Sequence, residues 1–124
     1  MTETFTAVPI LRIFDEAAAL AFYRDFLGFV IDWRHQTGDQ GPVYLQISRN
    51  GMRLHLTGHH GDCTPGSTVF VTATGLAAYH ADLAAKDYPF NRPGLEPAPW
   101  GGMVMEVTDP FANRLRFWEE ETQK

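Results

Sequence analysis

The sequence predicts an α+β fold built from two tandem copies of a strand–helix–strand–strand–strand (βαβββ) unit. Each of two helix-like segments follows a run rich in β-branched and aromatic residues, as strands are, and each is followed by a segment typical of an antiparallel hairpin. The runs NGMRLHL (50–56) and FANRLRF (111–117) stand at matching places, at a period of roughly 60 residues. We therefore expect one domain over residues 1–124, with repeat one at about 5–58 and repeat two at about 67–120.

Repeat one opens with a predicted strand and helix. The strand AVPILRIFD (7–15) ends at Asp15, whose carboxylate can accept hydrogen bonds from the free N–H groups of a following helix. Apolar side chains then recur at helical spacing, namely at Ala19, Phe22, Tyr23 and Phe26. Gly28 is expected to end this helix, because a left-handed residue is favoured there.

Repeat one continues with a strand at residues 30–36 and a hairpin over residues 42–58. Asn50-Gly51 is a strong signal for a two-residue hairpin loop, and it places Gln46 opposite His55. One face then carries Val43, Leu45, Ile47, Leu54 and Leu56, and the other carries Tyr44, Gln46, Ser48, Arg53, His55 and Thr57. Such a sheet packs against helices on one side and presents a polar surface on the other.

Repeat two follows a linker at residues 59–67. A strand at 68–73 precedes a helix at 74–88, whose predicted core positions are Leu76, Tyr79, Ala81 and Leu83. A short strand and a Pro-rich loop occupy residues 88–102, and a second hairpin turns at DPFAN (109–113).

The second hairpin is predicted to have one apolar and one charged face. With Thr108 paired to Arg114, the helix-facing side carries Met105, Val107, Leu115 and Phe117, and the other side carries Val104, Glu106, Arg116 and Trp118. Glu106 then lies opposite Arg116, a cross-strand pair worth a few tenths to about 1 kcal/mol.

Charge and composition exclude several classes of protein. Ten basic and fifteen acidic residues give a net charge of −5, which disfavours nucleic acid as a partner. No run is long enough to cross a bilayer, and the N-terminus does not read as a signal peptide. A single cysteine, Cys63, cannot form an intramolecular disulfide. We expect a cytoplasmic protein without a membrane partner.

Several runs carry a resemblance to a known family. FYRDFLGF after the first strand, GLAAYHADL in repeat two and PWGGMVMEVTDPFANRLRFWEE at the close occur in this order. With the tandem βαβββ layout, they resemble the vicinal-oxygen-chelate superfamily, which includes glyoxalases, extradiol dioxygenases and bleomycin-resistance proteins. The bleomycin-resistance branch is the most similar. The resemblance implies a U-shaped mixed sheet with helices on its convex side and the ligand on its concave face.

Enzymes of this superfamily bind a divalent metal through the first and last strands of each repeat. The resemblance maps these positions to about Val8, His55, about Thr68 and Arg116, of which His55 alone is a competent ligand. The run HHGDC (59–63) has ligand-type residues, but its spacing fits structural zinc poorly. We therefore predict no metal, no cofactor and no catalytic residue. The loss of the metal-ligand positions favours a binding protein over an enzyme.

The resemblance also implies a ligand groove at a homodimer interface. Trp100 matches a groove tryptophan of the bleomycin-binding branch, and Asp32 and Trp33 match an acidic–aromatic pair that lines it. The remaining predicted ligand-binding residues are Gln46, His55, Glu106, Arg116 and Trp118. Arg34 and His35, close to Asp32 in the sequence, depart from the acidic surroundings that a cationic drug would favour.

The leading functional hypothesis is non-catalytic sequestration of a bleomycin-type antibiotic, or a similar flat cationic molecule, at the dimer groove. Two alternatives stay open. One is a metal-dependent enzyme of the glyoxalase, dioxygenase or thiol-transferase type, using a displaced site around His55, Glu106 or residues 59–63. The other is a binder of an unrelated metabolite, since a fold alone does not define function.

Overall fold

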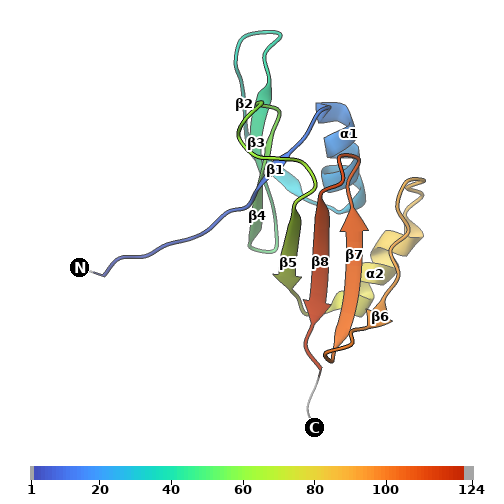
Figure 1. Ribbon diagram of the computed structural model, residues 1–124. Coiled ribbons are helices and arrows are strands. Elements are labelled where there is room, and N and C mark those ends of the chain that lie inside the picture. The colour runs from blue at the N-terminus through green and yellow to red at the C-terminus, as the bar shows by residue number, and fades with distance from the viewer. Residues whose placement is uncertain (1, 122–124) are drawn as a thin grey trace.

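The two repeats form two four-stranded mixed sheets. A computed structural model describes residues 2–121 (Figure 1). The first sheet has the order β1-β4-β3-β2, from β1 (Ile10–Arg12), β2 (Val30–Gln36), β3 (Val43–Arg49) and β4 (Met52–Thr57). The second has the order β5-β8-β7-β6, from β5 (Thr68–Thr72), β6 (Glu96–Pro97), β7 (Met103–Thr108) and β8 (Arg114–Glu119). In each sheet the first strand pairs in parallel with the last, so the predicted tandem βαβββ fold is confirmed.

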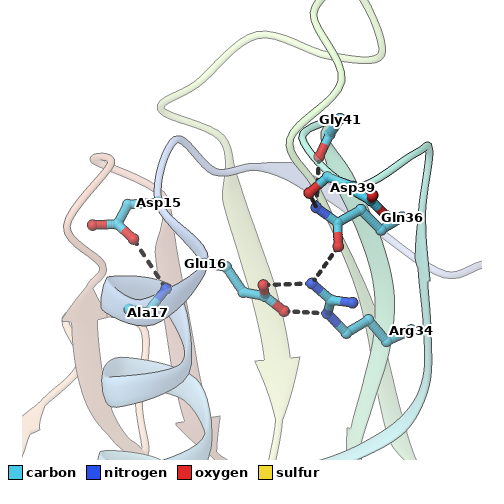
Figure 2. Close-up of polar contacts among 7 residues, drawn as sticks. All are labelled: Asp15, Glu16, Ala17, Arg34, Gln36, Asp39 and Gly41. Atoms are coloured by element: carbon cyan, nitrogen blue, oxygen red, sulfur yellow. Dashed lines mark hydrogen bonds and ion pairs between the residues drawn. The ribbon is translucent and has the colours of Figure 1, made fainter.

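The first helix begins as predicted and then widens. Asp15 caps α1 (Glu16–Leu20) by accepting from the Ala17 N–H at 3.0 Å (Figure 2). The helix continues as a π-helical segment, η1 (Ala21–Phe26), and ends before Gly28, which has a φ of +85°. The predicted apolar positions Ala19, Phe22, Tyr23 and Phe26 are all buried. The wider turn keeps the three aromatic rings together on the core side.

Both hairpins have the predicted register. In the first, Asn50 and Gly51 have positive φ angles, as a primed two-residue turn requires, and Gln46 lies opposite His55. In the second, Glu106 lies opposite Arg116. The predicted apolar faces are buried: Val43, Leu45, Ile47, Leu54, Leu56, Met105, Val107, Leu115 and Phe117 belong to the core.

One predicted core position in the second helix is wrong. In α2 (Leu76–Ala85), Leu76 and Leu83 are buried and Tyr79 is partly buried, but Ala81 is exposed. The spacing of the other three positions defines one helical face, and Ala81 lies well outside it at 100° per residue. Within residues 2–121, no helix has the length and apolar character needed to span a membrane.

The turn between β7 and β8 joins the two repeats. Asp109 and Asn113 are buried in it. The Tyr23 hydroxyl donates to Asp109 at 2.7 Å, and the Asn113 amide donates to the Arg12 carbonyl oxygen at 2.8 Å. Asp109 also accepts from the backbone N–H groups of Phe111 and Asn113, each at 2.8 Å. Burial raises the pKa of Tyr23 well above its usual value, so the phenol stays a proton donor to Asp109.

Candidate functional site

A β-bulge in β2 directs Asp32 and Trp33 to the same side of the first sheet. Ile31 pairs with Ile47 and Trp33 pairs with Gln46, which leaves Asp32 as an extra residue. The Asp32 carboxylate accepts from Gln46 Nε2 and Ser48 Oγ, both at 2.9 Å. We call this side, with Tyr44, Gln46, Ser48 and His55, the polar face. The bulge places a carboxylate and an indole next to each other on it.

A chain of hydrogen bonds connects the polar face from Tyr44 to Asp32. His55 Nε2 lies 3.0 Å from Gln46 Oε1, and an amide oxygen can only accept, so Nε2 carries the proton. Nδ1 of the neutral ring then accepts from the Tyr44 hydroxyl at 2.7 Å. Burial, with a contribution from Arg53, lowers the pKa of His55 and favours this neutral form. Both ring nitrogens of His55 are therefore engaged.

Aromatic rings cover the polar face beside Asp32. The rings of Trp33 and Tyr44 are nearly parallel, at 7°, with centroids 5.9 Å apart. Trp33 also meets His55 edge-on at 5.2 Å and stays 44% exposed. The exposed part of this indole offers apolar surface to a planar molecule, and Asp32 offers a negative charge next to it.

Arg34 does not reach the polar face, contrary to the expectation from its position in the sequence. It pairs across the sheet with Leu45, a core residue, and so lies on the helix-facing side. There its guanidinium donates to both oxygens of Glu16 in α1, and Nη2 also donates to Gln36 Oε1 at 3.1 Å (Figure 2). The charge of Asp32 is therefore not neutralised by Arg34.

The second sheet carries an ion pair where the first has the neutral Gln46–His55 pair. Arg116 Nε donates to Glu106 Oε2 at 2.8 Å, and Arg114 Nη1 lies 3.8 Å from the other oxygen. Glu106 and Arg116 line a cavity of about 500 Å³ together with Trp100 and Glu96. The predicted cross-strand pair is confirmed.

Trp118 holds the loop that carries Trp100. The Trp118 indole N–H donates to the Gly101 carbonyl oxygen at 2.8 Å. The backbone of Gly102, at a φ of +77°, passes so close to the end of β8 that a Cβ there would lie 2.2 Å from the Glu119 carbonyl oxygen. Trp100 itself is 57% exposed. Trp118 was predicted to lie on the ligand side, and within residues 2–121 the hydrogen bond of its side chain is to this loop.

The predicted site residues form two groups within one chain. Asp32, Trp33, Gln46 and His55 belong to the first sheet. Glu106, Arg116 and Trp118 belong to the second, and Trp100 lies in the loop between β6 and β7. The cavity at Trp100 is lined by residues between Gly94 and Arg116 and includes none of the first group. Tyr44, Ser48 and Glu96 were not predicted as site residues. For Tyr44 and Ser48, the available signal was their alternation with core residues on β3.

The residues present do not fit the metal centre of the enzymes that the sequence resembles. The parallel pairing puts Ile10 beside His55 and Phe70 beside Arg116. Ile10 lies two residues after Val8, which precedes β1, and Phe70 lies two residues after Thr68 on the same side of β5. Neither an isoleucine nor a phenylalanine side chain binds a metal. Within residues 2–121, no three His, Cys, Asp or Glu residues are grouped so that they could hold an ion.

The linker cluster is also engaged in other contacts. Asp62 accepts from the Thr57 hydroxyl at 2.7 Å. Burial, with the nearby charge of Asp62, raises the pKa of the Cys63 thiol, so the less reactive protonated form is favoured.

Comparisons with known proteins agree with this architecture. The family model described as "Glyoxalase superfamily protein" matches residues 3–124. A bleomycin-binding protein from Streptomyces verticillus, solved with copper(II)-bleomycin, is 28% identical, with a TM-score of 0.67 over 98% of this chain and all of that one. A bleomycin resistance determinant encoded on transposon Tn5 is 23% identical, with a TM-score of 0.73 over 96% of this chain and all of that one.

An enzyme relative shares the fold as well. A glyoxalase-related enzyme from Clostridium phytofermentans is 17% identical, with a TM-score of 0.72 over 96% of this chain and 97% of that one. The comparison with curated proteins found no match. At 17% and 23% identity, the Clostridium phytofermentans structure and the Tn5 determinant show a shared fold alone. Because the family match covers nearly the whole sequence, the chain belongs to the glyoxalase superfamily, also known as the vicinal-oxygen-chelate superfamily.

Proposed function

We propose that the protein binds and sequesters a flat, cationic small molecule of the bleomycin type in a groove at a homodimer interface, without converting it. The observation that carries this proposal is the bulge in β2, which presents the Asp32 carboxylate beside the exposed indole of Trp33. The fold shared with bleomycin-binding proteins supports the ligand class. We expect the sequestration to take place in the cytoplasm.

The charge on Asp32 favours a cationic ligand. Its hydrogen-bond donors, Gln46 and Ser48, are neutral, and none of the ion pairs within residues 2–121 includes it. A planar ring that stacks on Trp33 gains about 0.5–1.5 kcal/mol beyond its buried area. A cationic group on the same ligand would then lie within reach of Asp32.

A second copy of the chain is the simplest way to complete the groove. Trp33 lies in the first sheet and Trp100 in the β6–β7 loop of the second repeat, and each keeps about half of its surface exposed, at 44% and 57%. Ile10, Val30 and Phe70 are exposed apolar side chains on the two sheets. Pairing the first sheet of one copy with the second sheet of another would cover these side chains and bring an acidic–aromatic pair opposite a second tryptophan.

Intrinsic tryptophan fluorescence during titration with metal-free bleomycin tests the proposal. We expect a saturable change at micromolar drug, weakened about tenfold or more in Trp33→Ala and retained in Phe90→Ala, a control at an exposed aromatic elsewhere. Mass spectrometry should recover the drug unaltered. No saturable change would reject bleomycin as the ligand, and a monomer in sedimentation would reject the interface groove.

Elemental analysis distinguishes the enzyme alternative. Protein purified without chelators should contain no stoichiometric transition metal, because His55 is engaged at both nitrogens and Arg116 takes the place of a carboxylate ligand. A stoichiometric metal would overturn the sequestration proposal in favour of a displaced catalytic site.

A further inference from the structure

Arg12 is a largely buried cation. It ends β1 and is only 9% exposed. Its guanidinium lies 4.4 Å from the centre of the Phe14 ring, and Nη1 donates to the Ile13 carbonyl oxygen at 2.7 Å. No ion pair joins Arg12 to a carboxylate of residues 2–121. A largely buried cation without an ion-pair partner is costly, and an anion bound beside it would reduce that cost.

Arg12 has N–H groups that make no hydrogen bond within residues 2–121, and it lines an open pocket. Nη1 makes both of the side-chain hydrogen bonds of Arg12, to Ile13 and, at 3.5 Å, to Thr57. In the described part of the chain, every wholly buried side-chain nitrogen or oxygen has a hydrogen-bond partner. Nε and Nη2 therefore keep access to solvent, and Arg12 lines a pocket of about 340 Å³ between β1, the start of α1 and the β2–β3 loop.

The polar groups opposite Arg12 are already satisfied. Figure 2 shows Glu16 bound by Arg34, while the Gln36 amide is held between Arg34 and the carbonyl oxygen of Gly41, the latter at 3.0 Å. The hydrogen bond from Arg34 lowers the pKa of Glu16 and keeps it ionised in this pair. This wall needs no further ligand, and it adds no net charge to the pocket.

The charges that line the pocket favour a ligand with a single negative charge over one with two. Asp15 also lines the pocket, and it uses one carboxylate oxygen to cap α1. A phosphate dianion would be repelled by Asp15 and would find a single guanidinium. A planar carboxylate carries one charge and matches the paired N–H groups of one arginine.

We propose that this pocket is a binding site for the carboxylate group of a small molecule, held by Nε and Nη2 of Arg12. The site is separate from the proposed groove, because its lining includes neither Asp32 nor either of the groove tryptophans. A second copy of the chain is not needed to complete it. Carboxylate binding at Arg12 is therefore independent of bleomycin binding in the groove.

Titration of the whole protein with sodium acetate tests the proposal by NMR. At constant pH and ionic strength, with chloride as the balancing anion, we expect saturable shifts at the Arg12 Nε–H and at the amides of Gly41 and Gly58. Inorganic phosphate should bind more weakly. Shifts that do not saturate would overturn the site, and tighter binding of phosphate would overturn the assignment to carboxylates.

Two variants and a matched control complete the test. Arg12→Gln should weaken acetate binding about tenfold or more, because a charge-assisted hydrogen bond contributes about 1.5–3 kcal/mol. Arg24→Gln, at an exposed arginine of η1 that lies outside both sites, should leave it unchanged. Arg12→Lys keeps the charge and loses the two-pronged geometry, so it should bind less tightly than wild type even if Arg12→Gln does not fold. Equal binding by wild type and the folded Arg12 variants would overturn the proposal.

Discussion

The hairpins β3–β4 and β7–β8 occupy equivalent places in the two repeats, yet they differ at the turn and on the polar side. The first turns in two residues at Asn50 and Gly51, both exposed. The second turns through Asp109–Asn113, where the first and last residues are buried and bind the first repeat. The β3–β4 turn is thus an exposed hairpin end, whereas the β7–β8 turn joins the two repeats.

The polar sides of the two hairpins also differ in charge. Gln46 and His55 form part of a neutral chain of hydrogen bonds that ends on the charged Asp32. Glu106 and Arg116 neutralise each other. Equivalent positions therefore hold a neutral pair next to the Asp32 carboxylate on one sheet and an ion pair on the other. A cationic ligand would be attracted to the first sheet.

The largest expected effect separates the two turns. Asp109→Ala should lower the free energy of unfolding by about 3 kcal/mol or more, because the buried groups of Tyr23 and Asn113 lose their acceptor. Asn50→Ala, at a φ of 49°, should lower it by about 1 kcal/mol. Urea denaturation measures both. Similar losses in the two variants would show that the second turn does not join the repeats.

The next effect tests the difference in charge. Asp32→Asn should weaken binding of the cationic ligand about tenfold, because it removes the carboxylate that faces neutral donors. Glu106→Gln should change the affinity much less, since Arg116 already neutralises Glu106. Fluorescence titration with bleomycin at low and high salt measures both, and a larger effect of Glu106→Gln would reverse the assignment of the two sheets.

A smaller effect is expected on stability from the Glu106–Arg116 pair. Both side chains keep about a third of their surface exposed, at 35% and 38%, so the pair is open to screening. Glu106→Gln should cost less than about 1 kcal/mol, and the loss should shrink in 1 M NaCl. Gln46→Leu in the neutral pair serves as the comparison, and its cost should not depend on salt. Chemical denaturation at two salt concentrations decides between them.

The smallest effect is a pH dependence from His55. Its folded-state pKa is lowered from 6.5, so the unfolded chain takes up this proton first as the pH falls. The stability associated with the neutral ring is present above pH 6.5 and is lost as the pH falls through the folded pKa. Wild type should therefore lose more stability than His55→Gln between pH 7.5 and 5.5. Equal losses in thermal melts at the two pH values would contradict the neutral assignment.

The sequence predicted the repeats and both hairpin registers because short-range signals determine them. Asn50-Gly51 fixes one register and the apolar alternation around Glu106 fixes the other. The bulge could not be predicted, since it depends on how β2 aligns with a strand that follows it. With regular alternation, Asp32 and Arg34 would share a face and Trp33 would lie opposite. The extra residue instead puts Trp33 on the same face as Asp32 and Arg34 on the opposite face.

The buried Arg12 was likewise beyond sequence reasoning. Its guanidinium packs against the Phe14 ring, and the loop before β3 lines the same pocket, and neither contact follows from the residues next to Arg12 on the strand. Ala81 failed for a simpler reason, because alanine is apolar yet small enough to remain on the exposed side of a helix at little cost.

The bulge also makes Asp32 a removable unit of the chain. Because Ile31 and Trp33 pair with consecutive residues of β3, deleting Asp32 leaves a regular ladder in which Trp33 keeps its partner and its side. A single codon lost or gained at this position would switch the acidic group off or on, while the core pattern of the strand and the indole beside it stay the same. Ligand charge in such a protein can then change by insertion and deletion, independently of the substitutions that maintain the fold.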